Sequence, residues 1–422
     1  MIFRNTIPKY QVMVYFKRLL ETKLKTLFSL FPVVCIQGAR QVGKSTLVEK
    51  TFGGKIPTVT FDPVTDIDDA RKDPDFFLQT HPSPVFLDEI QYAPELLSSL
   101  KRKVDREKKA GMYIISGSQN LGILKNISES LAGRVIILDL HTMSQRELNE
   151  NTENKSVIYH YLFEENINLQ NIMKINFPDL KRNLWRGFFP GLIDKPDDAV
   201  PYFYDSYLRT YIERDIRVLA NLDSMQEFGN FFGILAGLSS TEINPSEIGR
   251  ELGIDRKTAK RWMMLAEQSF QWITVPSFSR NPVKKVSQKS KGYFTDTGII
   301  CSLQKISSPE SVLSHPMKGR LFETYIVMEI LKTVQEFPVR PNLYHFRSHS
   351  GAELDLILEI DGKLFPIEIK MKSNPSKDDA KNFSSFKTMF PNENISKGMI
   401  ISSAESPRWI TEDVFTVPYW LI

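Results

Sequence analysis

Short apolar runs recur along the first third of the chain and alternate with longer stretches of helical periodicity. The runs cover residues 32–36, 83–87, 112–115 and 135–138, and a helical stretch at 95–108 lies between two of them. Continuous apolar runs of this length are typical of strands buried on both faces, and their alternation with helices predicts a parallel sheet. We therefore expect an α/β fold, a doubly wound parallel sheet, over residues 1–148.

The pattern after residue 240 predicts two adjacent helices. Asn244 and Pro245 have the order of an N-cap and a first-turn proline, and Asp255 caps a second helix at 256–268. Apolar residues of this second helix fall on one side and basic residues on the other: Ala259, Trp262 and Leu265 against Arg256, Lys257, Lys260 and Arg261. This helix-turn-helix spacing, followed by a basic segment from Arg280 to Lys291, predicts a winged-helix domain over 241–305. Residues 149–240 are expected to form a helical lid or linker region.

A third pattern marks the C-terminal part. Residues 353–360 alternate between apolar and polar positions, as in a strand with one buried face. An Asp-Gly pair at 361–362 follows, and this pair is the strongest short signal for a hairpin. A two-residue turn would place Asp355 opposite Glu368 on the returning strand. Pro366 lacks a backbone donor, which predicts that the returning strand is an edge strand or contains a bulge.

The first apolar run leads into a complete G-x-x-x-x-G-K-S phosphate loop. Its residues, with the first residue of the following helix, are Gly38, Ala39, Arg40, Gln41, Val42, Gly43, Lys44, Ser45 and Thr46. The glycines allow consecutive backbone N–H groups to surround phosphates, Lys44 neutralises the phosphate oxygens, and the Ser45 hydroxyl is a ligand for Mg²⁺. The N-terminus of the helix faces the same phosphates. The chain is therefore predicted to bind ATP together with Mg²⁺.

Polar groups at the ends of two later strands supply the chemistry of hydrolysis. Asp88 and Glu89 follow the run at 83–87, at the carboxyl edge where open α/β sheets bind ligands. Asp88 is predicted to hold the Mg²⁺ shell, and Glu89 to polarise the attacking water. After the next strand, Ser118 or Gln119 either senses the γ-phosphate or belongs to an ordinary turn.

Arg134 stands immediately before the strand at 135–138 and has two interpretations. It is either an arginine finger that reaches the γ-phosphate of a neighbouring subunit in a homo-oligomer, or a surface residue at the end of a helix.

The order of four segments, GARQVGKST, FLDEIQ, SGSQN and SLAGRV, resembles the AAA-type ATPase module of a large prokaryotic family of predicted ATPases with a nuclease-like C-terminal part. The resemblance runs through nearly the whole chain. It implies the family's loop roles for Lys44 and Ser45, and its acidic roles for Asp88 and Glu89. Ala39 replaces the usual proline and Ser45 the frequent threonine, and neither change removes a required group.

Asp355, followed by Glu368 and Lys370 on the next strand, resembles the core of the PD-(D/E)XK nuclease pattern, and Glu323 matches the helical acid of that fold. The resemblance implies a restriction-endonuclease-like α+β domain over 306–422. In such a site Glu323, Asp355 and Glu368 hold Mg²⁺, and Lys370 orients the attacking water. The alternatives are an amphipathic hairpin with a solvated charged face, or a domain that keeps the fold without catalysis.

The length and composition of the chain limit the classes of protein to which it can belong. With 422 residues, 41% of them hydrophobic and 25% charged, the chain is expected to be globular and to contain several domains. Its net charge of only +4 means that a nucleic-acid partner would need a local basic patch. Cys35 and Cys301 are too few for a disulfide framework or a zinc site. The first twenty residues lack a signal-peptide pattern and no apolar run reaches about 18 residues, so we expect a cytoplasmic protein without a membrane partner.

Two hypotheses of function follow. The first is an ATPase coupled to a winged-helix and nuclease-like region that binds or cleaves DNA or RNA. The second is a slow ATP-dependent regulatory switch whose C-terminal region is a protein-interaction scaffold without nuclease activity.

Overall fold

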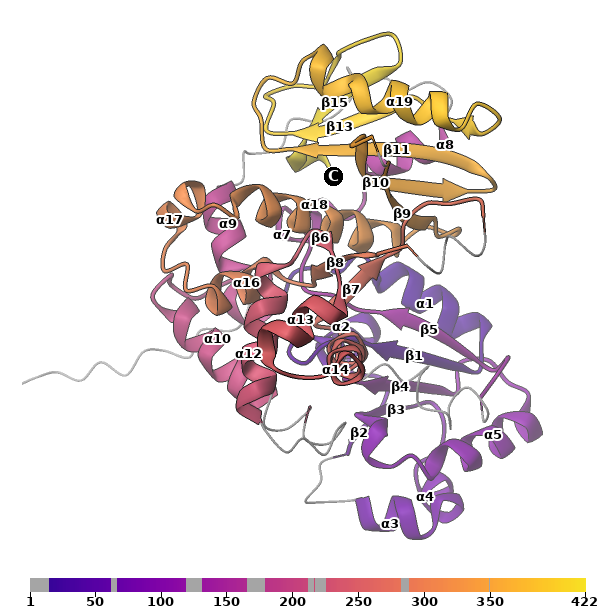
Figure 1. Cartoon of the computed structure of the whole chain (residues 1–422). Helices are drawn as coiled ribbons and strands as arrows, with labels where there is room; N and C mark the ends of the chain where they lie inside the picture. Colours follow the sequence, from indigo (N-terminus) through magenta and orange to yellow (C-terminus); the bar gives the residue numbers. More distant parts are fainter. Residues whose placement is uncertain are drawn as a thin grey trace, which may run out of the picture.

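A computed structural model describes residues 15–61, 67–118, 131–164, 179–211, 216, 225–281, 288–348 and 350–422. Two parts of the sequence predictions, Gln119 and the segment 282–287 of the basic wing, lie outside these residues. The described chain forms an N-terminal α/β region, a mostly helical middle region and a C-terminal mixed sheet, which lie at the lower right, the left and the top of Figure 1.

Five parallel strands form the sheet of the N-terminal region, in the order β2-β3-β4-β1-β5. The strands are β1 (Val33–Gln37), β2 (Thr58–Thr60), β3 (Val85–Asp88), β4 (Tyr113–Gly117) and β5 (Val135–Asp139), and the helices are α1 (Glu21–Leu30), α2 (Lys44–Phe52), α3 (Ile67–Lys72), α4 (Pro74–Thr80) and α5 (Leu96–Glu107). Every residue of β1, β3 and β4 is buried, as expected for central strands of a parallel sheet. The predicted parallel α/β sheet is confirmed.

Helices dominate the middle region. They are α7 (Gln145–Leu148), α8 (Val157–Phe163), α9 (Leu180–Arg186), α10 (Ala199–Thr210), α12 (Met225–Gly237), α13 (Pro245–Leu252), α14 (Arg256–Gln268), α16 (Thr297–Leu303) and α17 (Pro309–Ser314). A small antiparallel sheet joins β6 (Thr241–Glu242), β8 (Lys291–Phe294) and β7 (Trp272–Val275), in that order. The predicted helix pair is confirmed, because Asn244 caps α13, Asp255 caps α14, and Ala259, Trp262 and Leu265 are buried.

The C-terminal region combines one long helix with a seven-stranded mixed sheet of order β14-β15-β13-β11-β10-β9, in which β12 also pairs with β11. Its elements are α18 (Lys318–Val334), β9 (Asn342–Arg347), β10 (Glu353–Ile360), β11 (Lys363–Lys370), α19 (Lys381–Met389), β12 (Asn394–Ile395), β13 (Gly398–Ser402), β14 (Arg408–Trp409) and β15 (Val414–Pro418). The predicted hairpin is confirmed with its register, because Ile360 pairs with Lys363 and Leu356 with Ile367.

Pro366 does not lie on an edge strand, so this part of the prediction is wrong. β11 runs between β10 and β13, inside the sheet. Pro366 falls between the part of β11 that pairs with β12, which ends at Leu364, and the part that pairs with β13, which begins at Ile367. No ladder pairing on that side is therefore interrupted. Its carbonyl accepts a hydrogen bond of 2.9 Å from the hydroxyl of Tyr161 in α8.

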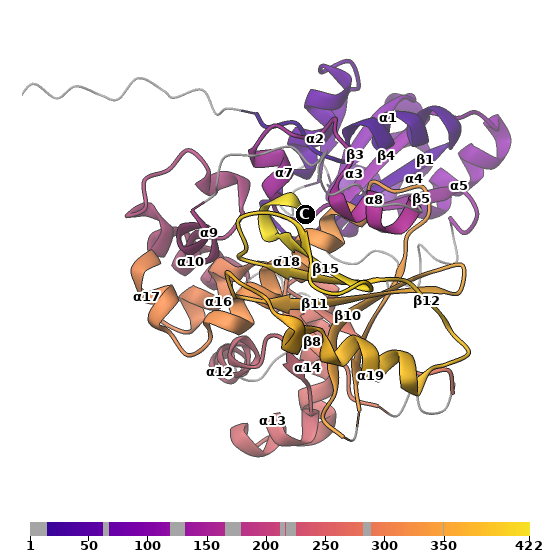
Figure 2. The ribbon, with the colours of Figure 1, turned by 90° about the horizontal axis from the view of Figure 1, so that it is seen from above.

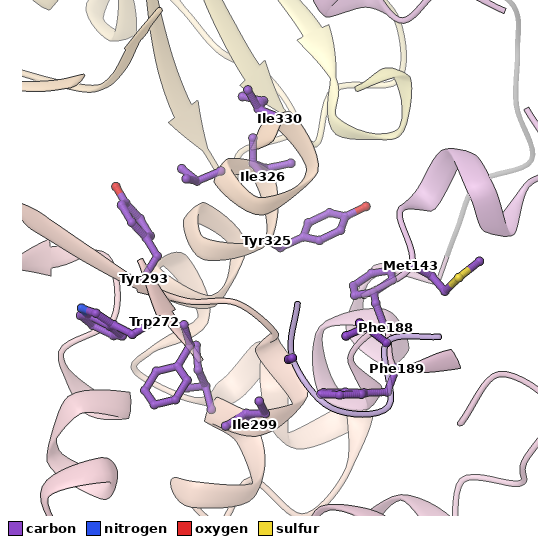
Figure 3. Packing of buried hydrophobic residues seen from close by; sticks show 14 of the residues in the cluster. Met143, Phe188, Phe189, Trp272, Tyr293, Ile299, Tyr325, Ile326 and Ile330 are labelled. Atoms are coloured by element: carbon purple, nitrogen blue, oxygen red, sulfur yellow. The ribbon is translucent and has the colours of Figure 1, made fainter. Parts of the chain in front are cut away.

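A single cluster of buried apolar side chains crosses all the predicted domain boundaries. It contains residues from β1, α12, α18 and the C-terminal sheet, such as Val34, Phe231, Ile326 and Met399. Figure 3 shows Phe188 near Tyr325 of α18, and the rings of these two residues stack with centroids 5.4 Å apart. Figure 2 shows β10 and β11 passing over α18 near the centre of the molecule. The regions therefore share one core, although the boundaries at 148, 240 and 305 stay predictions.

Among the helices that can be described, none is both long and apolar enough to cross a membrane. Cys35 and Cys301 are free cysteines and both are buried.

Candidate nucleotide site and C-terminal carboxylate cluster

The phosphate loop occupies the carboxyl edge of the parallel sheet, between the end of β1 and the start of α2. Gly43 precedes α2 with a φ of 92°, a conformation that favours glycine. Gly38 is required for a different reason, because a Cβ at this position would lie 2.0 Å from the carbonyl oxygen of Leu140. Both glycines therefore let the backbone turn tightly under the position that phosphates would take.

Lys44, Ser45 and Asp88 converge at this edge, as the sequence predicted. The Lys44 ammonium donates hydrogen bonds to the carbonyls of Gly38 (3.0 Å) and Ala39 (3.1 Å). The Ser45 hydroxyl donates to Asp88 Oδ2 at 2.6 Å. Two oxygen ligands of the kind that Mg²⁺ prefers thus stand side by side next to a lysine.

Glu89 lies directly beyond Asp88, in a left-handed conformation with φ of 58°. One of its carboxylate oxygens is 3.8 Å from Lys44 Nζ, and the other accepts hydrogen bonds from the backbone N–H of Ser118 (3.2 Å) and from the side chain of Gln91. Burial on its own would raise the pKa of Glu89, but Lys44, Gln91 and Arg40 outweigh it and the net pKa is lowered. Glu89 is therefore held as an oriented anion.

Arg18 is a buried residue of this site that sequence reasoning missed. Its guanidinium donates to the carbonyl of Val42 in the loop (2.8 Å) and to that of His141 after β5 (2.7 Å), and it lies 3.0 Å from Glu147. Arg18 thereby fixes the loop to the segment that follows β5. No local motif marks it, because its partners become neighbours only in the fold.

A cavity of about 200 Å³ opens beside the loop. It is lined from the loop side by Arg40, Gln41 and Glu89, and from α10 and the residue after it by Tyr207, Thr210 and Tyr211. The middle region therefore contributes one wall beside the nucleotide site, and the lid at 149–240 stays a prediction.

Arg134 lies at the opposite edge of the sheet from the phosphate loop. β1 and β5 run parallel, with Val33 beside Val135 and Gln37 beside Asp139, so the residue before Val135 is at the amino edge. The Arg134 guanidinium makes two hydrogen bonds to the carboxylate of Asp105 in α5. It therefore cannot reach the loop of its own chain, and its role as a finger for a neighbouring chain stays a prediction.

The predicted C-terminal carboxylates also converge, but around a lysine that the sequence had assigned to an exposed basic wing. Lys291 Nζ lies 3.0 Å from Glu323, 2.8 Å from Glu353 and 3.1 Å from Asp355. Its side chain is only 3% exposed, so that assignment is wrong. Burial on its own would lower the pKa of Lys291, but Asp355 and its neighbours outweigh burial and raise it well above its usual range.

Further hydrogen bonds hold this C-terminal carboxylate cluster, defined as Glu323, Glu353, Asp355 and Glu368. Glu323 accepts from the hydroxyls of Tyr293 (2.9 Å) and Ser240 (3.1 Å), and Asp355 accepts from the backbone N–H of Ile369 (2.9 Å). These bonds, together with Lys291, bring β8, α18, β10 and β11 to one point.

Glu368 and Lys370 form a pair beside Lys291, with 2.6 Å between Glu368 Oε1 and Lys370 Nζ. Burial, with Asp355 nearby, raises the pKa of Glu368 to about 8, and the same two causes raise that of Glu323 to about 7. The other carboxylate oxygen of Glu368 is buried and has no hydrogen-bond partner among the described residues.

The C-terminal carboxylate cluster does not fit a metal ion in this arrangement. The ammonium of Lys291 already takes the position among the carboxylates that an ion would need. In the part of the chain that the structure describes, no group of three or more His, Cys, Asp or Glu side chains is arranged to hold a metal. The roles of Glu323, Asp355 and Glu368 as metal ligands, and of Lys370 in catalysis, stay predictions.

The basic face of α14 is exposed, as predicted. Arg256, Lys257, Lys260 and Arg261 all point to solvent, and none of them forms an ion pair with another described residue. The wing differs, because Arg280 pairs with Glu359 at 2.7 Å and also with Glu393.

Comparison with known proteins supports the N-terminal assignment. Residues 30–149 match the family model of the AAA domain, and residues 177–310 and 318–422 match two domains of unknown function, DUF8612 and DUF4143. Two uncharacterized proteins, from Mycobacterium tuberculosis and Mycobacterium bovis, are each 26% identical over 348 residues, which is 82% of this chain and 71% of theirs. The solved Walker-type ATPase of Pyrococcus abyssi is 16% identical, with 71% of this chain and 99% of that chain covered. Its TM-score of 0.43 is too low to support an argument.

The family match and the geometry of the loop together define the N-terminal region as an AAA-type P-loop ATPase domain, and they support ATP binding.

Proposed function

We propose that this protein hydrolyses ATP with Mg²⁺ at the phosphate loop. The observation that carries the proposal is the convergence of Lys44, Ser45, Asp88 and Glu89 at one edge of the sheet. Ser45 and Asp88 offer a hydroxyl and a carboxylate oxygen that fit a magnesium ion. When bound, that ion neutralises charge on the phosphates.

Different groups of the protein bind the phosphates and orient the attacking water. Backbone N–H groups from Ala39 to Ser45 bind the phosphates, and Lys44 exchanges its hydrogen bonds to the loop carbonyls for bonds to phosphate oxygens. Glu89 orients the attacking water, because its lowered pKa keeps it ionised and Ser118 holds one of its oxygens. Ser118 therefore positions Glu89 rather than contacting the water itself.

Two substitutions separate binding from hydrolysis. Glu89→Gln should retain ATP but lower turnover by about 10² to 10⁴-fold, which is the usual contribution of a positioned acid–base group. Lys44→Ala should weaken ATP binding by roughly a hundredfold, through loss of a charge-assisted contact. Glu49→Gln, an exposed residue of α2, is the matched control and should change neither quantity. Unchanged turnover in Glu89→Gln, measured by phosphate release, would refute the role given to Glu89.

A second function is favoured by the exposed basic face of α14. We propose that α13, α14 and the β6-β8-β7 sheet form a winged helix that binds nucleic-acid phosphates through this face. Lys260→Ala with Arg261→Ala should weaken binding to a DNA or RNA duplex and reduce its salt dependence, in fluorescence anisotropy at several salt concentrations. Lys25→Ala, an exposed lysine of α1, is the control. Binding that does not depend on salt would contradict the proposal.

For the C-terminal region, the position of Lys291 favours a role without metal-dependent cleavage. The regulatory alternative, in which ATP turnover is slow and the C-terminal sheet contacts another protein, is therefore preferred over a nuclease. Mg²⁺-dependent cleavage of DNA or RNA that disappears in Glu368→Ala and survives in Lys44→Ala would reverse this preference.

A further inference from the structure

We propose that Lys291 is a built-in counter-cation that replaces a divalent metal ion in the C-terminal carboxylate cluster and closes the cluster to metal from solvent. This inference goes beyond the proposed ATPase, and it concerns a different part of the molecule.

Three carboxylates from two separate elements meet at the same ammonium group. Glu323 comes from α18, whereas Glu353 and Asp355 come from β10, and each has an oxygen within 2.8 to 3.1 Å of Lys291 Nζ. A primary ammonium has three donors, and these carboxylates supply three acceptors. The contacts to Glu323 and Asp355 are hydrogen bonds and the contact to Glu353 is an ion pair, so the charge of the lysine lies where a cation bound by these carboxylates would lie.

The contacts of β8 hold the backbone of Lys291 in place beside the cluster. Lys291 lies in the central strand of its sheet, paired with Glu242 on one side and Val275 on the other. The next residue, Gly292, packs so closely on Trp272 that an added Cβ would lie 1.9 Å from the indole ring. Tyr293, two residues further on the same face, also donates to Glu323 at 2.9 Å. The strand is thus fixed against α18 by two of its own side chains.

Two consequences follow from this geometry. The carboxylates are neutralised from the middle region, so Lys291 attaches β8 to the C-terminal sheet. A divalent ion could use Glu323 and Asp355 together only after the ammonium of Lys291 had left its place between them. The cluster resembles a nuclease site in its acidic residues. Its counter-charge, however, is the ammonium of Lys291, which belongs to another region of the chain.

Metal binding can be measured without any enzymatic activity. We would use the full chain with Asp88→Asn, which removes the magnesium ligand of the loop, and count bound Mn²⁺ by electron paramagnetic resonance without nucleotide. The protein with Lys291 intact should bind no Mn²⁺ at the cluster. Adding Lys291→Met should create one site per chain, and adding Asp355→Asn to that variant should abolish it. Mn²⁺ should also raise the unfolding temperature of the Lys291→Met protein alone.

Lys332→Met is the matched control, because Lys332 is also buried and pairs with Glu329 on the same helix. It should gain no Mn²⁺ site. Since loss of the ammonium leaves several carboxylates without a counter-charge, Lys291→Met with Glu353→Gln provides a second variant of lower charge. Two results would overturn the proposal: an Asp355-dependent Mn²⁺ site in the protein with Lys291 intact, or a folded Lys291→Met protein, in either form, that gains no site.

Discussion

The phosphate loop and the C-terminal carboxylate cluster are both built from lysines and acids, but they use their lysines in opposite ways. Lys44 donates hydrogen bonds to two loop carbonyls and stands 3.8 Å from Glu89, at the loop where a phosphate would bind. Lys291 is surrounded by three carboxylates within 3.1 Å. Lys44 is therefore placed to bind a ligand, whereas Lys291 holds parts of the protein together.

The acids of the two sites show the same contrast. Lys44 and its neighbours lower the pKa of Glu89 against the effect of burial, whereas burial and Asp355 raise the pKa of Glu368 to about 8. An acid that must act on water at neutral pH needs its charge maintained by the site. The comparison supports the proposal that the loop carries the chemistry, whereas the C-terminal carboxylate cluster joins parts of the chain.

α18 links the two sites physically. Its N-terminal half carries Glu323, and in its C-terminal half Glu329 accepts a hydrogen bond of 2.7 Å from the backbone of Gln145, just beyond the ATPase sheet. Lys332 donates to the carbonyl of Met143 at 2.8 Å. The segment that contacts α18 in this way follows His141, whose carbonyl is held by Arg18 beside the loop.

The largest expected effect tests whether the nucleotide site is complete within one chain. If Arg134 acts on the nucleotide of a neighbouring chain, Arg134→Ala should lower the rate of ATP hydrolysis by about a thousandfold, the usual effect of losing an arginine finger. Its unfolding temperature should change little, because the pair with Asp105 is solvent-exposed. Phosphate release and thermal unfolding measure the two quantities.

Mixing variants makes this test specific. Glu89→Gln chains lack the residue that orients water but keep Arg134, so mixing them with Arg134→Ala chains should restore activity above the sum of the separate rates. Asp105→Ala is the control that breaks the same ion pair without removing the arginine. A mixture that never exceeds the sum would show that Arg134 does not act between chains.

The next largest effect concerns the contact between α18 and the ATPase domain. Glu329 is buried and paired with Lys332 at 2.9 Å, so Glu329→Ala should lower the free energy of unfolding by about 3 kcal/mol, since it leaves a buried ammonium without its partner. The double variant Glu329→Gln with Lys332→Met removes both charges and should lose less stability. Denaturant unfolding measures both. Equal losses in the single and double variants would mean that the charge pair is not the cause.

A pH dependence of opposite sign should distinguish the acids of the two sites. Because the folded-state pKa of Glu368 is raised to about 8 and that of Glu323 to about 7, the folded protein holds these protons more tightly than the unfolded chain. Their contribution to stability is therefore complete below about pH 4.5 and is lost as the pH rises towards 8, by on the order of 1 kcal/mol per pH unit for each proton. Glu89, with a lowered pKa, contributes stability that is lost as the pH falls.

Glu368→Gln should flatten the decline in stability between pH 6 and pH 8, as measured by denaturant unfolding at each pH. Glu405→Gln, an exposed acid, is a suitable control and should keep the wild-type slope. The same slope in Glu368→Gln and the wild-type protein would show that Glu368 does not titrate in this range.

The features that could be predicted from the sequence are those that depend on residues close together along the chain. The phosphate loop follows from a short motif, and the register of β10 and β11 follows from the turn at Asp361 and Gly362, because a two-residue turn fixes every later pair. Lys291 was misassigned because its partners Glu323 and Asp355 lie 32 and 64 residues away. Arg18 was missed for the same reason, since it meets His141 across 123 residues. Pairing at such distances depends on tertiary structure, which residue spacing does not encode.

The smallest expected effect concerns the proposed nucleic-acid surface. Here too we expect a basic side chain that is held by acidic residues of the protein to bind no ligand, and one that is exposed to bind phosphate. Arg280 is bonded to Glu359 and Glu393 and lies 5.2 Å from the ring of Phe278, so it should not contribute a phosphate contact. Arg280→Ala should therefore leave affinity for a nucleic-acid duplex unchanged and lower the free energy of unfolding by less than about 1 kcal/mol, as for other half-exposed ion pairs. Arg261→Ala on α14 should do the reverse, with no loss of stability and a salt dependence weaker by about one counterion. The opposite result would be that Arg280→Ala weakens duplex binding as much as Arg261→Ala does. That result would mean that a basic side chain in an internal ion pair can still bind a ligand, and the contrast between Lys44 and Lys291 would lose its physical basis.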